Sequence, residues 1–258
     1  MPDWNADRYH HISSPQQTWG RKVLDRLPLE GHEHVLDIGC GTGRVTGELA
    51  ARVPRGGVIA LDRSPAMLAT AREWLHAHAP GVRLVLADGA ALPFQRRFDA
   101  VFSTATFHWI HDHAALFRSI ITALRPGGRL VAQCGGAGNL ALLLGRAERL
   151  MREPRFANNF DDWTEPTYFS DVDSAGRRMR AAGFEEIEAS LEPAPTSFDS
   201  PLAFQEFIAN VCVRYHLARL SPRDGDLFLR ELTVAAAADS PPLTLDYWRL
   251  NLSARRPK

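Results

Sequence analysis

The sequence predicts an α/β protein built on a mostly parallel β-sheet. Two observations carry this prediction. From Gly31 onward, short apolar runs of strand length alternate with segments of helical periodicity, and such alternation is typical of β-α-β units. A glycine-rich turn, "GCGTG" (39–43), joins the first apolar run to the first helical segment. In sheets of this kind the ligand binds outside the carboxyl ends of the strands.

Apolar runs mark the predicted strands. Five of them are "HVLDIG" (34–39), "GVIALD" (57–62), "VRLVLAD" (82–88), "FDAVFST" (98–104) and "RLVAQC" (129–134), the last one after a turn "RPGG" (125–128). Helices are predicted between the strands. One covers 45–53, a second begins after Ser64 as N-cap with Pro65 in the first helical position, and a third begins after Asp112 as N-cap. Two later runs, "FEEIEASLE" (184–192) and "LTLDYWRLNLSARR" (243–256), are expected to complete the sheet as an antiparallel pair.

We expect one domain, because no Ser- or Gly-rich linker divides the 258 residues. Residues 31–135 would form the ligand-binding core, with 171–192 and 241–256 completing the sheet. Three segments fall outside the alternation and are expected to form a helical cap over the site: residues 1–30, 139–168 and 199–239.

Composition excludes several classes of function. Thirty Lys+Arg balance thirty Asp+Glu, so no net charge favours a nucleic acid or an anionic membrane as partner. The three cysteines, Cys40, Cys134 and Cys212, fit neither a disulfide framework nor a zinc site, which favours a reducing cytosol. The start lacks the apolar run of a signal peptide, and no apolar stretch is long enough for a membrane span. The oligomeric state stays open.

Acidic residues accompany the glycine turn. Asp37 precedes it, Asp62 ends the second predicted strand, and Asp88 ends the third. A carboxylate at such a strand end can accept hydrogen bonds from ribose hydroxyls or from the exocyclic amine of a base. Each acid could instead cap a following turn, but three at consecutive strand ends favour a nucleotide-like ligand. Arg44 stands where the dinucleotide fingerprint needs its third glycine, which disfavours a nicotinamide oxidoreductase.

These motifs resemble those of class I S-adenosylmethionine-dependent methyltransferases. "VLDIGCGTG", "ALDRSPAML", "LADGAALPF" and "LRPGGRL" match the family's successive motifs over residues 31–135. The resemblance implies a Rossmann-like seven-stranded sheet with helices on both faces, and S-adenosylmethionine as methyl donor. It implies cofactor roles for Asp37, Gly39, Cys40, Gly41 and Gly43 toward the methionine part, Asp62 toward the ribose, Arg63, Met67, Asp88, Gly89 and Ala90 around the adenine, and Thr104.

A narrower resemblance extends over most of the chain. "DWNADRYHH" through "VLDRLPLE", and "TFHWIHDHAALF", look like segments of trans-aconitate methyltransferases, and juvenile hormone acid methyltransferases share a similar "HW" segment. Both groups methylate carboxylates of small molecules, so the resemblance implies O-methylation of a carboxylate. Malonyl-carrier-protein methyltransferases also have a Trp-containing segment here, which keeps a carrier-bound acceptor open.

The segment "STATFHWIHDH" (103–113) holds three histidines. A metal site is not expected, because His113 is five residues from His108 and no Cys or carboxylate cluster completes a ligand set. His111 and His113 flank the predicted cap and are expected to be exposed loop residues. His108 and Trp109 are candidate pocket residues. The family pattern has Gln or His at the position of His108, which favours a hydrogen-bonding role over an obligatory catalytic base.

A carboxylate acceptor needs a hydrogen-bond donor of opposite charge. In "PLAFQEFIANVCVRYHL" (201–217), Arg214 lies near the apolar stripe of a predicted cap helix and could grip a carboxylate with two hydrogen bonds. Alternatively its charged end lies in water. From the N-terminal helix, Tyr9 and Gln17 could reach the donor or the acceptor.

Three functions therefore remain open from the sequence. The leading one is a cytosolic small-molecule methyltransferase acting on a carboxylate, which is already ionised at neutral pH and needs no base. The second is a C- or O-methyltransferase of a phenol or an activated carbon with His108 as general base. The third is a non-catalytic S-adenosylmethionine-binding regulator, which the intact loop and acids disfavour.

Overall fold

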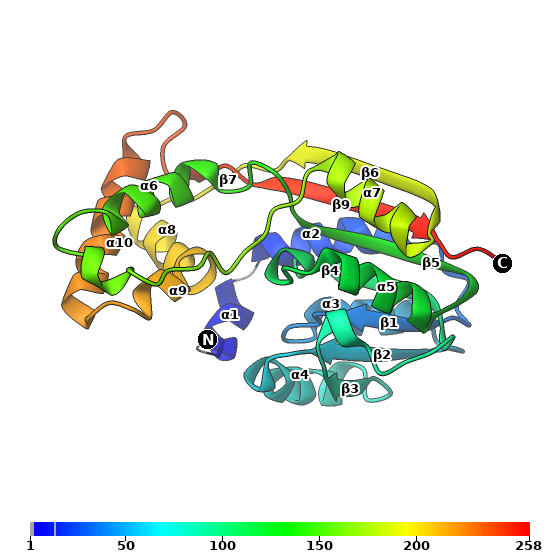
Figure 1. Cartoon of the computed structure of the whole chain (residues 1–258). Coiled ribbons are helices and arrows are strands. Elements are labelled where there is room, and N and C mark those ends of the chain that lie inside the picture. Colours follow the sequence, from blue (N-terminus) through cyan, green and yellow to red (C-terminus); the bar gives the residue numbers. More distant parts are fainter. Residues whose placement is uncertain (1–2, 13) are drawn as a thin grey trace.

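A seven-stranded sheet forms the centre of the computed structural model, which describes residues 3–12 and 14–258 (Figure 1). Its strand order is β3-β2-β1-β4-β5-β9-β6. The strands are β1 (His34–Ile38), β2 (Gly57–Asp62), β3 (Arg83–Leu86), β4 (Phe98–Thr104), β5 (Leu124–Gly135), β6 (Glu185–Pro193) and β9 (Trp248–Arg255). The first five are parallel, and β9 is antiparallel to both β5 and β6. The predicted Rossmann-like sheet with a late antiparallel pair is thereby confirmed.

Helices cover both faces of the sheet. Helices α2 (Ser14–Asp25), α3 (Arg44–Arg52) and α4 (Pro65–His78) lie on one face, and α5 (His113–Ala123) and α7 (Val172–Ala182) on the other. The predicted caps are confirmed: the Ser64 hydroxyl accepts the Met67 N–H, and the Asp112 carboxylate accepts the Ala115 N–H. Two apolar clusters, one on each face, hold these layers together.

Strands β1 and β4 are neighbours, although two other strands separate them in sequence. The chain order therefore reverses between them, and the loops that follow β1 and β4 diverge. A crevice at such a switch point, outside the carboxyl ends of the strands, is where open α/β sheets bind their ligands.

A second group of helices packs at one end of the sheet, at the left of Figure 1. It comprises α6 (Ala141–Met151), α8 (Pro201–Phe207), α9 (Arg214–Leu217) and α10 (Pro222–Ala237), with the two-stranded pair β7 (Thr196–Ser197) and β8 (Thr244–Leu245). These elements have their own apolar cluster, which also takes in Trp19 of α2 and Tyr247 before β9. Helix α1 (Ala6–Ile12) lies between this group and the sheet (Figure 1).

Local structure differs from expectation at three places. "RPGG" belongs to the irregular start of β5, where Gly127 has φ +75°. The helix expected across 201–217 is interrupted by a π-turn, Ile208–Cys212, so Arg214 starts the short helix α9. His113 is not an exposed loop residue: it is 2% exposed and begins α5.

Within the described residues, no helix is long and apolar enough to cross a membrane.

Candidate active site

Three adjoining cavities open at the carboxyl ends of β1, β2 and β4. The nucleotide cavity is lined by Gly39, Gly41, Asp62, Arg63, Met67, Asp88, Gly89, Thr104, Thr106, Ile110 and neighbours. The loop cavity is lined by Gln16, Gln17, Asp37, Gly39, Cys40, Gly41, Thr42, Arg44 and Thr104. The inner cavity lies toward the helical group and contains His108, Trp109, Tyr247 and Arg249. Tyr9 and Ala105 line all three, so the cavities meet at these two residues.

The glycine turn at the end of β1 packs tightly against Thr106, in the loop that follows β4. Gly39 has φ +74°, and a Cβ there would lie 2.1 Å from Thr106 Oγ1. Only glycine fits, because both the backbone conformation and the space exclude a side chain. The Gly41 N–H donates to Asp62 Oδ2 at 3.0 Å, which ties the turn to the end of β2.

Two acids border the nucleotide cavity. Asp62 accepts the Ser64 N–H at 2.9 Å as well as that of Gly41, and burial raises the pKa of its carboxyl. Asp88 accepts the Ala90 N–H at 2.8 Å at the end of β3. Both carboxylates therefore have fixed orientations, and each keeps further lone pairs with which to accept hydroxyl or amine protons.

A third acid, Asp37, is buried at the wall of the loop cavity. It is 2% exposed and accepts a 2.6 Å hydrogen bond from the Thr46 hydroxyl. Burial, together with the charge of Asp62, raises the pKa of Asp37 to about 7. A cationic group in the loop cavity would offset the cost of burying this carboxylate, so Asp37 fits as a hydrogen-bond acceptor for the ammonium of a methionine moiety.

Most of the cofactor residues predicted from sequence line these two cavities. They are Asp37, Gly39, Cys40, Gly41, Asp62, Arg63, Met67, Asp88, Gly89 and Thr104. Gly43 does not: it caps α3 with φ +82°, and a Cβ there would lie 2.9 Å from Leu75 Cγ. Ala90 lines a separate open cavity beside Trp109 and Trp163. Burial raises the pKa of the Cys40 thiol well above its usual value, so it is no nucleophile.

The inner cavity contains a buried arginine that the sequence did not single out. Arg249 is 2% exposed, and its guanidinium lies 4.5 Å from the centre of the Trp19 ring. Its Nε donates to Gln133 Oε1 at 3.4 Å, while Nη2 is buried without a hydrogen-bond partner. Burial lowers the pKa of Arg249, yet an arginine remains protonated in proteins. A buried guanidinium of this kind calls for an anion.

No carboxylate that the structure describes supplies that anion. Glu192, the cross-strand neighbour of Arg249 on β6, is exposed and forms no ion pair with it. Hydrogen bonds that run from Arg249 through Gln133 to Asn251 fix the position of its side chain instead. Gln133 donates to Asn251 Oδ1 at 2.7 Å, and the same oxygen accepts Arg26 Nη1 at 2.6 Å.

His108 lines the same cavity in a defined tautomer. Its Nδ1 accepts the Gly135 N–H at 3.2 Å, and a backbone amide can only donate. Burial and the charge of Arg249 hold the pKa of His108 well below its usual value. The ring is therefore neutral, with its proton on Nε2. In this form Nε2 is a hydrogen-bond donor and has no lone pair with which to accept a proton.

The other two histidines of the segment have different surroundings. His113 Nε2 lies 3.0 Å from the carbonyl oxygen of Phe107, and its ring packs against Tyr168. His111 is exposed. Across the described chain, no three His, Cys, Asp or Glu side chains gather as metal ligands would.

The N-terminal segment closes over the junction of the cavities. Asp3 accepts the Ala66 N–H at 3.1 Å and the Ser64 hydroxyl at the start of α4. The Trp4 ring packs edge-on against Trp109 at 5.5 Å. Burial raises the pKa of Tyr9 to about 12, so its hydroxyl stays protonated.

Arg214 lies against this segment. Its guanidinium is 3.7 Å from the centre of the Trp4 ring and 3.9 Å from that of Tyr215, and burial lowers its pKa to about 10. It is not among the residues that line the nucleotide, loop or inner cavity. In this position Arg214 holds Trp4 over the cavities.

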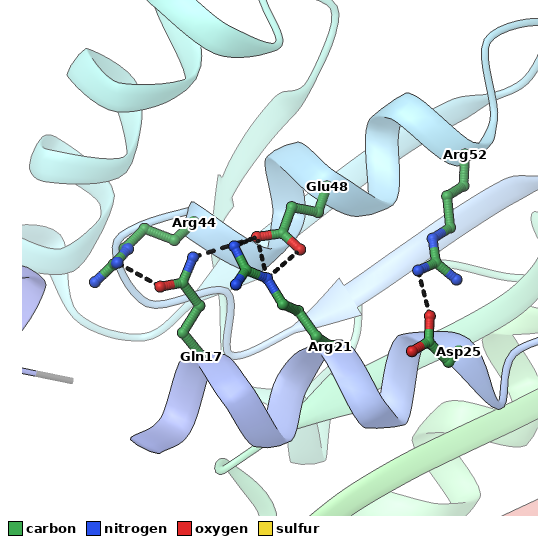
Figure 2. Close-up of polar contacts among 6 residues, drawn as sticks. All are labelled: Gln17, Arg21, Asp25, Arg44, Glu48 and Arg52. Atoms are coloured by element: carbon green, nitrogen blue, oxygen red, sulfur yellow. Dashed lines mark hydrogen bonds and ion pairs between the residues drawn. The ribbon is translucent and has the colours of Figure 1, made fainter. Parts of the chain in front are cut away.

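Gln17 is engaged in the contacts between α2 and α3 (Figure 2). Its carbonyl oxygen accepts from Arg44, and its amide donates to Glu48 Oε1 at 3.2 Å. Arg21 and Glu48 form an ion pair beside it. The adjacent Gln16 differs: it is 9% exposed, lines the loop and inner cavities, and its Oε1 has no partner.

Sequence reasoning therefore missed Arg249, Gln16 and Ala105. The alternation of "WRLNL" does signal a strand with one polar face. Nothing local shows that α2 buries this face. Ala105, with φ +55° directly after β4, carries no sequence signal for its position at the junction.

Comparisons with known proteins agree with this geometry. A family model described as "Methyltransferase domain" matches residues 35–128. The chain is 32% identical to a trans-aconitate 2-methyltransferase of Methylobacterium nodulans, with 99% of each chain covered. It is 35% identical to one of Shigella flexneri over 63% of this chain and 61% of that one. Among solved structures, a phosphoethanolamine N-methyltransferase of Haemonchus contortus shares the fold with a TM-score of 0.65 and 21% identity, over 98% of this chain and 57% of that one.

Proposed function

Since the chain belongs to the S-adenosylmethionine-dependent methyltransferases related to trans-aconitate 2-methyltransferase, we propose that it methylates the carboxylate of a small-molecule acid. The chain is an enzyme of this family acting on small molecules, and S-adenosylmethionine is its methyl donor. The nature of the acceptor and the roles of individual residues are the proposal.

In this proposal, the nucleotide and loop cavities hold the donor. Asp62 accepts the ribose hydroxyls, and Asp88 borders the adenine together with Met67. Asp37 faces the ammonium from the loop cavity. The bound donor supplies an electrophilic methyl group on a sulfonium, and the junction at Ala105 leaves the inner cavity as the place for the acceptor.

One observation carries the carboxylate: the buried guanidinium of Arg249 has no described acidic partner. A buried charge is costly unless it is paired and hydrogen-bonded. An acceptor carboxylate would complete the pair and would use the free Nη2 of Arg249. We propose Arg249 for this role in place of Arg214, which stacks on Trp4 and Tyr215 outside the inner cavity.

The tautomer of His108 supports the same acceptor. With its proton on Nε2, His108 can donate a hydrogen bond to a carboxylate oxygen. A carboxyl group with a pKa of about 4 is already ionised at neutral pH. Transfer then forms one O–CH3 bond and breaks one S–CH3 bond, and no proton has to be removed. The chain's own contribution is to bind, align and exclude water.

The alternative acceptor is a phenol or an acidic carbon, with His108 as general base. That chemistry needs an unprotonated nitrogen facing the acceptor. The hydrogen bond from Gly135 occupies the unprotonated nitrogen, Nδ1.

The free thiols of Cys40, Cys134 and Cys212 support a reducing cytosol as the place of action.

Product chemistry tests the proposal. The enzyme would be incubated with methyl-labelled S-adenosylmethionine and small acids, and the labelled product treated with mild base. A methyl ester releases labelled methanol under these conditions. Label that resists base would show an ether, an amine or a new carbon–carbon bond, and would reject the carboxylate acceptor.

A further inference from the structure

We infer that the acceptor is a monocarboxylic acid with an apolar body, and not a polycarboxylate such as trans-aconitate. The inference rests on the proposed carboxylate chemistry and concerns the remainder of the acceptor molecule. It differs from what the names of the similar enzymes suggest, because it comes from the residues that surround Arg249 in this chain.

The inner cavity offers a single positive charge. Of the described residues that line it, Arg249 is the one Lys or Arg, and none is Asp or Glu. His108 is neutral for the reasons given above. The remaining ionisable groups are also neutral, because burial raises the pKa of Tyr9 and of the Cys212 thiol to about 12 and that of Tyr247 well above its usual value. One carboxylate on the acceptor would therefore neutralise the single positive charge of the inner cavity.

Aromatic and aliphatic side chains make up most of the inner cavity's walls, and Gln16, Asn139 and Thr167 add uncharged polar groups. The apolar residues include Trp4, Trp19, Trp109, Phe169, Leu140, Leu144 and Val211. The cavity has a volume of about 50 Å³ in this structure, so binding of an acid with a larger body requires its walls to move apart. Apolar walls favour an apolar ligand by roughly 25 cal/mol for each Å² removed from water.

Other arginines near the cavities lie outside the inner cavity. Arg44 lies in the loop cavity and donates to the His10 carbonyl oxygen at 2.7 Å and to Gln17. Arg63 lines the nucleotide cavity. Arg214 is stacked on Trp4 and Tyr215. None of the three lines the inner cavity.

A tricarboxylate would therefore bring two carboxylates with no cation to meet them. Removing an unpaired carboxylate from water is strongly unfavourable even after the surrounding protein relaxes. The single positive charge and the apolar walls of the inner cavity therefore both disfavour acids with several carboxylates. An acid with one carboxylate at one end of an apolar body satisfies both.

Binding to the wild-type enzyme tests this directly. Titration calorimetry with saturating S-adenosylhomocysteine would compare hexanoate, octanoate and trans-cinnamate with trans-aconitate and with cinnamamide. We expect at least one of the three apolar acids to bind tenfold or more tighter than trans-aconitate. Cinnamamide, which keeps the shape of cinnamate without the charge, should bind at least tenfold more weakly than cinnamate if cinnamate binds.

The outcomes separate the two proposals. If trans-aconitate binds as tightly as the best apolar acid, or if no apolar acid binds, the apolar monocarboxylate is wrong while carboxylate methylation stands. If cinnamamide binds as tightly as cinnamate, the charge is not recognised, and the proposed function fails with it.

A gain-of-binding variant gives a second test. Leu144→Lys adds a cation to the apolar wall of the inner cavity, and it should improve the affinity for trans-aconitate relative to octanoate by about tenfold or more. Leu142→Lys is the matched control, because Leu142 lies on the same helix and is 55% exposed. An unchanged ratio in folded Leu144→Lys would contradict the inference. If that variant does not fold, the wild-type titrations decide.

Discussion

The backbone N–H of Gly135 donates a hydrogen bond to Nδ1 of His108 at 3.2 Å. Gly135 is the last residue of β5 and pairs with Arg249 on the antiparallel strand β9. The same strand pair therefore places the guanidinium and fixes the tautomer of the imidazole. Both residues line the inner cavity and both carry N–H donors, an arrangement suited to a carboxylate and unsuited to removing a proton.

His108→Gln should retain activity within about tenfold, a loss of at most about 1.4 kcal/mol of transition-state stabilisation. Glutamine keeps a donating amide and does not titrate. At saturating S-adenosylmethionine, the pH–rate profile between pH 6 and 9 should be flat for wild type and variant alike, because burial holds the pKa of His108 well below its usual value. His108→Leu, which has no donor, is the control and should lose more. A general base would instead cost roughly 10²–10⁴-fold and would remove an acidic limb of the profile.

Asp62→Ala should weaken S-adenosylmethionine binding by roughly 1–3 kcal/mol, because ribose hydroxyls lose a charged acceptor. The substitution also frees the backbone N–H groups of Gly41 and Ser64. Asp62→Asn keeps an oxygen acceptor of the same reach and separates the two effects. Titration calorimetry measures the affinity, and an unchanged value in Asp62→Ala would place the ribose contact elsewhere.

Donor affinity should fall as the pH drops below about 7. Only the ionised form of Asp37 attracts an ammonium, and its pKa in the fold is raised to about 7. Asp37→Asn should bind S-adenosylmethionine weakly at every pH, with a flatter profile. Titrations at pH 6, 7 and 8 measure this, and a wild-type affinity independent of pH would contradict the assignment.

The same shift has a consequence for stability. The folded pKa of Asp37 lies above the unfolded value, so its ionisation opposes folding as the pH rises from about 4 to 7. Asp37→Asn, which can still accept from Thr46, should therefore raise the stability of the ligand-free protein at pH 8, on the order of 1–4 kcal/mol. The gain should vanish near pH 4. Thermal unfolding at both pH values tests this, and a destabilised variant at pH 8 would show that the carboxylate stabilises the fold.

Ala105 has φ +55° where the three cavities meet. A left-handed conformation costs a non-glycine residue roughly 1–2 kcal/mol, whereas glycine loses more entropy on folding. Ala105→Gly should therefore be stable within about 1 kcal/mol and active. Ala105→Val should lose activity, because a branched side chain is strained at this φ and fills the junction. Methyl transfer and thermal unfolding of both variants check this, and an active Ala105→Val would show that the methyl group passes elsewhere.

Alternation and capping were enough to predict the parallel core. The five runs from His34 to Cys134 became strands, and the caps at Ser64 and Asp112 lie where expected. These features depend on neighbours in sequence, which local patterns report directly. The prediction that His113 is an exposed loop residue was wrong, because its burial against Phe107 and Tyr168 depends on packing from another segment.

The acceptor site could not be predicted in the same way. Arg249 sits in a strand whose alternation indicates only that one face is polar. That face is buried because α2 covers it, with Trp19 on the guanidinium and Arg26 bound to Asn251. Arg214 was placed by assuming a continuous helix, and the π-turn at Ile208–Cys212 breaks that register. Both depend on long-range packing.

The central claim is that Arg249 binds the acceptor carboxylate, and the decisive measurement compares Arg249→Met with Arg214→Gln. Methionine keeps length and contact with Trp19 but removes the charge. Replacing a buried, unpaired charge with an apolar side chain should leave the ligand-free protein at least as stable. Arg249→Met should bind the acceptor acid at least about thirtyfold more weakly than wild type, a loss of about 2 kcal/mol or more. Its affinity for S-adenosylmethionine should be unchanged. Arg214→Gln should bind the acid within about tenfold of wild type. Normal acceptor affinity in Arg249→Met beside a large loss in Arg214→Gln would contradict the account.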